Sequence, residues 1–272
     1  MNIIEAHKLN YKVKNKNIFH DLDITIPYNE FVTVVGKNSV GKSTLLKILS
    51  GQIITDSKVS VDNIEVNKFN IEEIMQRYTV ISSYNEFFSR TVLEEILQDK
   101  RNVSVFEVNK VKKLLDEFNL LYLEKMTVQN LSYAENQIIA LIKAIIKKPK
   151  LIVLDNAFSK LDIDKRKELY SYLKNFASNN GITIISTTNN PEDLRFSDRV
   201  LLLKNGKIDY DGNYENFIKE IDLNKEGLKY PWEVEVSNKL MMYDLIDKDC
   251  FTIEDLVGEL CKYKNFIKVI QL

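Results

Sequence analysis

A loop early in the chain has the residue types and spacing of a phosphate-binding motif. It reads Gly36-Lys37-Asn38-Ser39-Val40-Gly41-Lys42-Ser43-Thr44, between the apolar run 31–35 and a helix-forming run. In a G-x-x-x-x-G-K-S motif the glycines let the backbone approach phosphate, and N–H groups at the helix N-terminus face the anion. The lysine contacts the terminal phosphates, and the next hydroxyl ligates Mg²⁺. We therefore expect all nine residues to bind nucleotide phosphate, with Ser43 also a metal ligand.

A second candidate group is a carboxylate further along the chain. Residues 151–154 are apolar and Asp155 follows them. This pattern is typical of a buried strand that delivers an acid to the magnesium shell. Any buried strand can end in an acid, so the indication depends on the phosphate loop upstream. With that loop present, we expect Asp155 to share the Mg²⁺ with Ser43.

The elements that must position these groups alternate between strand and helix patterns. Expected strands are the β-rich apolar runs 3–6, 22–26, 31–35, 59–61, 78–81, 151–154, 182–185 and 199–203. Expected helices span 42–51, 132–147 before Pro149, and 164–176. Residues 91–148 have a helical pattern throughout, with a capping box at 104–107. This order predicts an α/β fold of the P-loop NTPase class, with a RecA-like parallel core, an antiparallel β edge and an α-helical insertion.

The last fifty residues differ from this core. Residues 231–242 and 252–263 predict two amphipathic helices in a small α-rich domain, the second capped by Thr252. Cys250 and Cys261 lie there without metal-ligand spacing, which indicates two inert thiols in a reducing compartment.

Composition narrows the classes of function. The 272 residues are 44% hydrophobic and 28% charged, with a net charge of −1, which fits a globular protein with a large core. No basic stripe stands out, so we expect no nucleic-acid partner. The N-terminus lacks a signal-peptide pattern, and the apolar runs have the length of buried strands. We therefore expect a cytoplasmic chain that does not itself cross a membrane.

Residues between the phosphate loop and Asp155 carry a resemblance to a known family. Leu131-Ser132-Tyr133-Ala134-Glu135 resembles a decayed form of the LSGGQ signature of ABC ATPases. Residues 159–162 resemble the D-loop of that family, and 198–208 resemble its "DR-strand-x-GK-I" stretch. The resemblance implies that the ligand is ATP with Mg²⁺. It also implies that two subunits sandwich two nucleotides, with Ser132 contacting the nucleotide bound by a partner.

The C-terminal residues indicate a particular branch of this family. Residues 227–231 and 251–261 look like the C-terminal domain of energy-coupling factor (ECF) transporter ATPases. In that family a pair of ATPases lies beneath a transmembrane coupling protein, which holds an exchangeable substrate-capturing membrane protein for vitamins or metal ions. The resemblance implies a peripheral subunit at the cytoplasmic face of the cell membrane. It further implies three parts: a nucleotide-binding core (1–86 and 150–222), a helical subdomain with the signature (87–149), and a dimerisation domain (223–272).

Several residues depart from the pattern of the family. Asn156 stands where a glutamate acts as general base, and Thr188 stands where a histidine senses the terminal phosphate. An amide has no useful basicity, and general-base catalysis typically contributes about 10²–10⁴-fold. Ser82 replaces the Q-loop glutamine. Groups that hold phosphate and Mg²⁺ thus remain, whereas groups that drive hydrolysis are replaced.

Two further pairs of residues concern contacts with the adenine base and with the membrane partner. The aromatic that stacks on adenine in the family aligns near Val13, with Tyr11 as a possible substitute, while His7 and His20 are expected to be ordinary strand or loop residues. The adjacent Phe87 and Phe88 fit either a core role or an interface role.

The residues favour one function and leave others open. The replaced catalytic positions predict a subunit that binds ATP but hydrolyses it poorly. Because a homodimer would contain two such sites, we expect a heterodimer with a more complete ATPase. The alternative is a nucleotide-dependent regulatory protein without a role in transport. An ABC ATPase that acts on DNA or ribosomes is disfavoured because the basic or coiled-coil extensions of such proteins are missing from this sequence.

Overall fold

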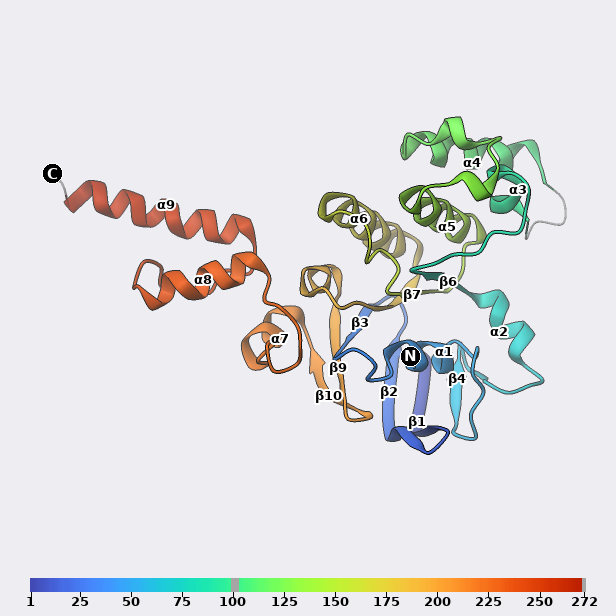
Figure 1. Ribbon diagram of the computed structural model, residues 1–272, viewed down its shortest axis with the longest axis horizontal. Helices are drawn as coiled ribbons and strands as arrows, with labels where there is room; N and C mark the ends of the chain where they lie inside the picture. The colour runs from blue at the N-terminus through green and yellow to red at the C-terminus, as the bar shows by residue number, and fades with distance from the viewer. Residues whose placement is uncertain (99–102, 271–272) are drawn as a thin grey trace.

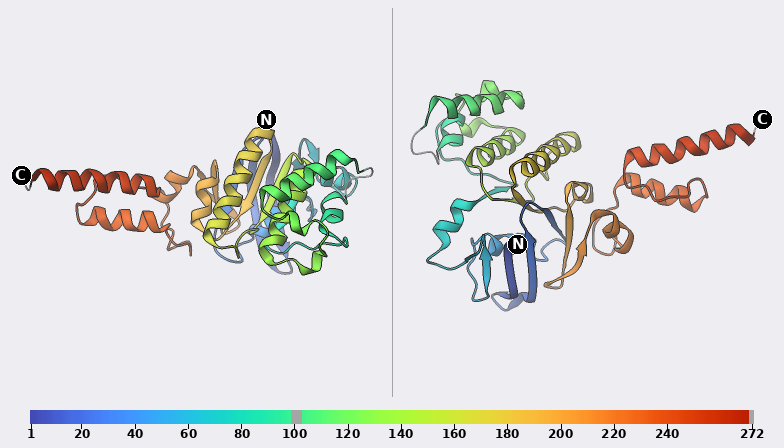
Figure 2. Two further views of the ribbon diagram at one scale, coloured as in Figure 1. Left: turned by 90° about the horizontal axis from the view of Figure 1, so that it is seen from above. Right: turned by 180° about the vertical axis from the view of Figure 1, so that it is seen from behind.

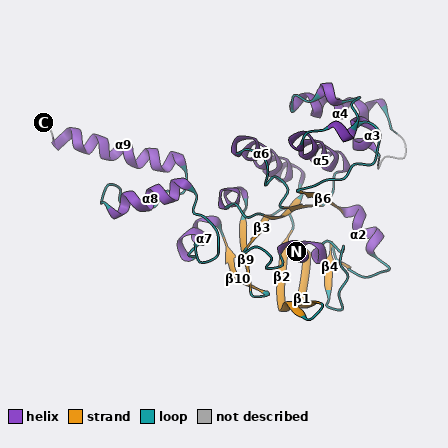
Figure 3. Cartoon of the chain, in the orientation of Figure 1, coloured by secondary structure: helices purple, strands orange, loops and turns teal. Residues whose placement is uncertain are grey.

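The computed structural model describes residues 1–98 and 103–270, with side chains to residue 262. Figure 1 shows two β-sheets at the centre, helices beyond one edge, and a pair of C-terminal helices that project from the body. Figure 3 shows the strands in the centre and lower part of the molecule, with helices above them and to both sides. The expected α/β fold with a parallel sheet is confirmed.

The larger sheet has six strands, of which five are parallel. Its order is β10 (Lys207–Gly212), β9 (Arg199–Lys204), β3 (Phe31–Val35), β8 (Thr183–Thr187), β7 (Leu151–Asp155) and β6 (Tyr78–Ser82), with β10 antiparallel to β9. Every residue of β3 and β8 is buried, as expected for parallel strands covered on both faces. The carboxyl ends of β3, β7 and β8 therefore meet at one edge, beside the phosphate loop.

The smaller sheet is antiparallel and has the order β2 (Lys16–Pro27), β1 (Asn2–Val13), β4 (Val59–Val61) and β5 (Ile64–Glu65). Its inner face shares one hydrophobic cluster with α1 (Lys42–Leu49) and with residues of β3 and β7. Both β1 and β2 run further than the expected strands 3–6 and 22–26. Most of their extra residues are exposed or half-buried, with Leu9 and Phe19 buried among them, so no continuous apolar run marks this part of the hairpin.

The described helices between β5 and β9 comprise those of the expected insertion (87–149) and others that connect strands. They are α2 (Ile71–Arg77), α3 (Val92–Leu97), α4 (Val105–Glu117), α5 (Tyr133–Lys147) and α6 (Ile163–Asn180), with the short turns η1 (Leu121–Leu123), η2 (Val128–Asn130) and η3 (Pro191–Phe196). The expected capping box at Ser104 and Glu107 is confirmed, and equivalent boxes begin α3 and α5. One hydrophobic cluster joins α3–α6 to β6, β7 and β8.

The C-terminal part contains α7 (Tyr214–Glu220), α8 (Trp232–Met242) and α9 (Ile253–Ile270). In both views of Figure 2, α8 and α9 extend away from the body. The expected end of the last helix at 263 is wrong, because α9 continues to Ile270. The division at 86/87, 149/150 and 222/223 stays a prediction; its parts 87–149 and 223–272 include residues 99–102 and 271–272, outside the described residues. Among the described helices, none is long and apolar enough to cross a membrane.

Candidate nucleotide-binding site

The phosphate loop connects β3 to α1 and has the tight backbone that its glycines permit. Gly36 has a φ of 149°, and a Cβ added there would lie 2.4 Å from the Leu203 carbonyl oxygen. Gly41 has a φ of 115°, and its Cβ would lie 2.9 Å from Ile18. Ser39 adopts a left-handed φ of 62° without being glycine, which costs about 1–2 kcal/mol. The loop therefore holds a conformation that its sequence does not favour at every position.

The N-terminus of α1 offers free N–H donors. Side chains of Thr91, Ser104, Ser132 and Asp162 cap α3, α4, α5 and α6, respectively. In contrast, Gly41 stands at the N-cap of α1, where the described residues supply no side-chain cap. The first N–H groups of a helix need a partner, and together with the helix dipole they favour an anion. The N-terminus of α1 can therefore bind a phosphate group.

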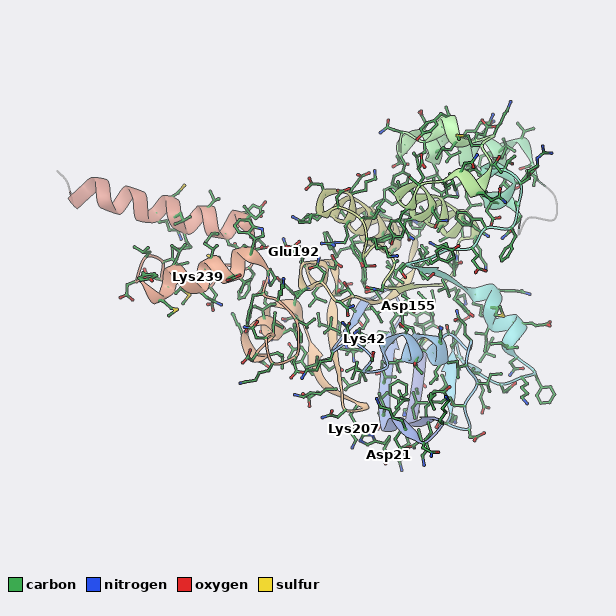
Figure 4. All side chains as sticks on the ribbon, in the orientation of Figure 1. Asp21, Lys42, Asp155, Glu192, Lys207 and Lys239 are labelled. Carbon is green, nitrogen blue, oxygen red and sulfur yellow. The ribbon has the colours of Figure 1, made fainter. Side chains whose placement is uncertain are left out.

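Lys42 lies over the loop. Its Nζ donates to the carbonyl oxygens of Gly36 (2.7 Å) and Lys37 (3.0 Å). Burial lowers the pKa of Lys42, and the charge of Asp155 acts in the opposite direction. Figure 4 labels Lys42 and Asp155 near the centre of the molecule. A lysine held over the loop in this way can move its charge from carbonyl oxygens to phosphate oxygens.

The expected metal ligands lie side by side. Ser43 donates its hydroxyl to Asp155 Oδ1 at 2.8 Å, and the Thr187 hydroxyl donates to the same oxygen at 2.9 Å. A hydroxyl and a carboxylate are oxygen ligands of the kind that Mg²⁺ prefers. Both face the loop, so the residues fit a Mg²⁺ bound through the phosphates of a nucleotide. When bound, such an ion neutralises charge on the phosphates.

A cavity of about 250 Å³ joins the loop to the ends of the neighbouring strands. It is lined by Ile18, Asn38, Ser39, Gly41, Lys42, Ser43, Thr44, Asn156, Thr187 and Asn189. The expected Asn156 thus lies with the phosphate loop, and its N–H donates to the Thr187 hydroxyl at 3.0 Å. Sequence reasoning missed Ile18, Thr187 and Asn189. Thr187 and Asn189 could have been found, because they follow the expected strand 182–185 at the edge where the site forms. The sequence contains no such indication for Ile18.

The expected adenine contacts are not among the residues that line the cavity. Tyr11 packs on the core of the antiparallel sheet, and Val13 is 45% exposed at the end of β1. An adjoining hollow of about 600 Å³ is lined by Lys16, Asn17, Ile18, His20, Ser39, Val40, Asn205 and Gly206. Ile18 borders both spaces. His20, which we expected to be an ordinary residue, borders the second, and contacts of Tyr11 or Val13 with a base stay predictions.

Comparison with known proteins identifies the family. Residues 19–159, more than half of the chain, match the profile of the ABC transporter family. The chain belongs to this family. The family binds ATP with Mg²⁺, which agrees with the phosphate loop and with the Ser43–Asp155 pair.

Individual relatives of this ABC ATP-binding chain carry names that refer to transport. The energy-coupling factor transporter ATP-binding protein EcfA1 of Ligilactobacillus salivarius is 31% identical over 97% of each chain. EcfA1 of Streptococcus thermophilus is 27% identical over 96% of this chain and 99% of its own. The spermidine/putrescine import ATP-binding protein PotA of Haemophilus influenzae is 32% identical over 78% of this chain and 58% of its own. The chain is thus related to ECF-type ATP-binding subunits over nearly its whole length.

Solved structures confirm the fold of this ABC chain. CbiO1 from Clostridium perfringens, described as part of the ABC transporter complex cbiONQ, superposes with a TM-score of 0.72 at 22% identity. The match covers 89% of this chain and 95% of that one. A bacterial Atm1-family ABC exporter with ATP bound gives 0.73 at 21% identity, over 82% of this chain and 41% of that one.

The expected ABC signature, residues 131–135, lies at the start of α5. Ser132 caps this helix by accepting the N–H of Glu135 (3.3 Å), and the Glu135 carboxylate accepts the N–H of Ser132 (2.7 Å). Tyr133, in place of a glycine, donates its hydroxyl to the Ala157 carbonyl oxygen at 2.9 Å. Ser132 is not among the residues that line the phosphate-loop cavity. Its contact with a nucleotide therefore requires a second subunit and stays a prediction.

Ser82 and Thr188, the two other positions at which we expect a family residue to be replaced, have different surroundings. Ser82 ends β6 opposite Asp155 of β7, and both line a cavity of about 260 Å³. Thr188 is buried, and its hydroxyl donates to Asp193 Oδ2 at 2.7 Å rather than facing the phosphate loop. Ser82 thus lies beside the expected metal ligand. Thr188 takes part in a buried network behind the site, and its neighbours Thr187 and Asn189 line the cavity instead.

The buried acid of this network has an unusual titration. Burial raises the pKa of Asp193 to about 6, against hydrogen bonding by Thr188 and the charge of Arg166, whose Nε lies 2.9 Å away. Because the folded state holds the proton more tightly than the unfolded chain, protonated Asp193 stabilises the fold fully below about pH 4. This contribution is lost as the pH rises through about 6.

We expect this titration to be visible in the free energy of unfolding. From pH 4 to pH 7 the stability of the wild type, relative to Asp193→Asn, should fall by about 2–3 kcal/mol. The ion pair with Arg166 forms only as Asp193 ionises, so its effect is already contained in this pH dependence. Urea unfolding of both proteins at several pH values measures the difference. A difference that stays constant with pH would show that Asp193 titrates normally.

Proposed function

We propose that this protein is the ATP-binding subunit of an ECF-type ABC importer. The observation that carries the proposal is the relation to EcfA1, which spans 97% of both chains and so includes the C-terminal part. Gly36–Thr44 surrounds the phosphates, Lys42 contacts the terminal ones, and Ser43 with Asp155 holds Mg²⁺. The cargo class is a vitamin or a metal ion, captured by a separate membrane protein.

The same proposal assigns this chain the weaker of two ATP sites. Asn156 cannot accept a proton, and the Thr188 hydroxyl is engaged with Asp193. A pair of identical copies would contain two such sites. We therefore infer a heterodimer with a second, more complete ATPase, formed in part through the C-terminal domain 223–272.

A pocket beside α5 supports a docking site for the transmembrane coupling protein. It has a volume of about 360 Å³ and is lined by Tyr84, Asn85, Glu86, Phe87, Phe88, Val128, Gln129, Leu131 and Asn136. Phe88 is 81% exposed, whereas Phe87 is half-buried against the core cluster of the helical part. The two aromatics therefore have different roles in the proposal: Phe87 belongs to the core and Phe88 to the interface.

Phe88→Glu is expected to release the protein from its membrane partner. An exposed aromatic anchor at an interface typically contributes 2 kcal/mol or more, so association should weaken by about 30-fold or more. Mg-ATP affinity should remain that of the wild type. Phe87→Glu should instead lower the free energy of unfolding by about 1–3 kcal/mol. Co-purification from the native membrane, nucleotide titration and urea unfolding of each variant measure these effects.

Phe69→Glu is the matched control, because Phe69 is 95% exposed and lies before α2, outside the pocket. Retained association of Phe88→Glu would place the docking surface elsewhere. The co-purification also tests the function itself: wild-type protein should retain a second ATPase and at least one membrane chain. Recovery of neither would overturn the importer proposal.

A further inference from the structure

An amide in the segment after β6 connects two other parts of the site. Asn85 Oδ1 accepts the N–H of Ser82 at 3.0 Å, and Asn85 Nδ2 donates to the Ser82 carbonyl oxygen at 3.1 Å. The same Nδ2 donates to Asn136 Oδ1 at 3.2 Å. Asn136 Nδ2 donates to the Asn85 carbonyl oxygen at 3.0 Å. Asn85 thus holds the end of β6 and the first turns of α5 together through reciprocal hydrogen bonds.

The Ser82 end of this connection lies beside the expected metal ligand. Ser82 is paired with Asp155 in the parallel register of β6 and β7. The N–H of Ser83 donates to the Asp155 carbonyl oxygen at 3.2 Å. A shift of Asp155 on binding Mg²⁺ is therefore passed directly to the end of β6.

The Asn136 end lies one helical turn from the signature serine. Its backbone N–H donates to the Ser132 carbonyl oxygen at 2.9 Å. Asn136 also lines the docking pocket together with Asn85 and Phe88. A movement of Asn136 thus affects both the surface that meets a partner nucleotide and the surface that meets a membrane partner.

A buried ion pair holds the far end of the same segment. The Glu95 carboxylate accepts the N–H groups of Phe88 (2.9 Å) and Ser89 (2.8 Å), and Lys143 of α5 donates to it at 2.6 Å. Glu95 is completely buried, and these bonds hold its pKa below the usual range against the effect of burial. The segment 85–89 is therefore bonded to α5 directly at Asn85 and, at Phe88 and Ser89, through Glu95 of α3, which lets it move with α5.

We propose that Asn85 is the positioning residue that transmits occupancy of the Mg-ATP site to the signature turn and the docking pocket. It acts in place of the glutamine missing at position 82, where the short serine side chain bonds locally to the Tyr84 carbonyl oxygen. The inference rests on the proposed binding of Mg-ATP. It assigns the coupling between the Mg-ATP site and the signature turn to Asn85, three positions after Ser82.

Hydrogen–deuterium exchange with and without Mg-ATP tests the inference on the full chain. In the wild type, Mg-ATP should slow exchange in the phosphate loop (36–44), and it should change exchange at 131–137 by about fivefold or more. In Asn85→Ala the slowing at 36–44 should remain, while the change at 131–137 should fall below about twofold. Asn130→Ala removes an exposed amide at the end of η2 and should match the wild type.

A second variant covers the case in which Asn85→Ala does not fold. Asn136→Ala removes the other half of the pair and should have the same effect, and a double variant should add nothing to either single one. A retained change at 131–137 in the single variants would overturn the role of Asn85. So would a wild type that responds only at 36–44. A wild type that does not respond at 36–44 would overturn the proposed nucleotide binding itself.

Discussion

Lys42→Ala is expected to weaken Mg-ATP binding by about 10–100-fold. The Lys42 ammonium is half-buried over the loop and donates to two carbonyl oxygens. Phosphate oxygens would replace these carbonyl oxygens as its acceptors. A hydrogen bond to a charged group contributes about 1.5–3 kcal/mol, and every 1.4 kcal/mol corresponds to a factor of ten. Titration with a fluorescent ATP analogue measures the dissociation constant.

Lys47→Ala serves as the control for this experiment. Lys47 lies in the last turn of α1 and is exposed, so its substitution removes the same charge from the same helix without touching the phosphate loop. Its affinity for Mg-ATP should stay within about twofold of the wild type. Equal affinities of Lys42→Ala and the wild type would remove the basis for assigning this loop to nucleotide binding.

The second large effect is on hydrolysis. The wild-type chain alone should turn over ATP about 10²–10⁴-fold more slowly than an ATPase with a general base, because Asn156 cannot accept the proton of the attacking water. Asn156→Glu should recover only part of this factor, about tenfold. Residue 156 has a φ of 51°, which asparagine tolerates better than glutamate, and Thr188 supplies no base.

Phosphate release in a single turnover, with enzyme in excess, measures this effect without interference from product release. The matched control is Asn189→Glu, which adds a carboxylate to the same cavity at a position outside the general-base alignment. We expect no gain in rate from it. Wild-type turnover within the usual enzyme range of about 1–10³ per second would disprove the assignment of a weak site.

Much of the fold could be predicted because local patterns and tertiary structure agree. The strand 59–61 and the capping box at Ser104 are found where their residues indicate. Prediction was less complete where the pattern is polar. In β10, exposed and half-buried residues alternate, as in Lys207-Ile208-Asp209-Tyr210, so no apolar run marks the strand.

The site was predictable where one continuous segment supplies it, as in the phosphate loop. It was not predictable where strand register brings distant residues together. Ile18, for example, reaches the loop from β2. Asn85 and Asn136 are separated by 51 positions, so their pairing leaves no local trace in the sequence. The Thr188 side chain points inward because its hydroxyl bonds to Asp193. The burial of Asp193 arises only in the folded chain, so the sequence did not indicate this direction.

The open N-terminus of α1 has a consequence for the fate of the protein in the cell. Because the described part of the chain supplies no side-chain cap, the first turn of α1 relies on water or on a ligand to satisfy its donors. A ligand present at about 100 times its dissociation constant stabilises the folded state by about 2.7 kcal/mol. A difference of that size changes the unfolded fraction roughly a hundredfold, and with it the exposure of the chain to proteases. The nucleotide supply would then set how long each copy survives.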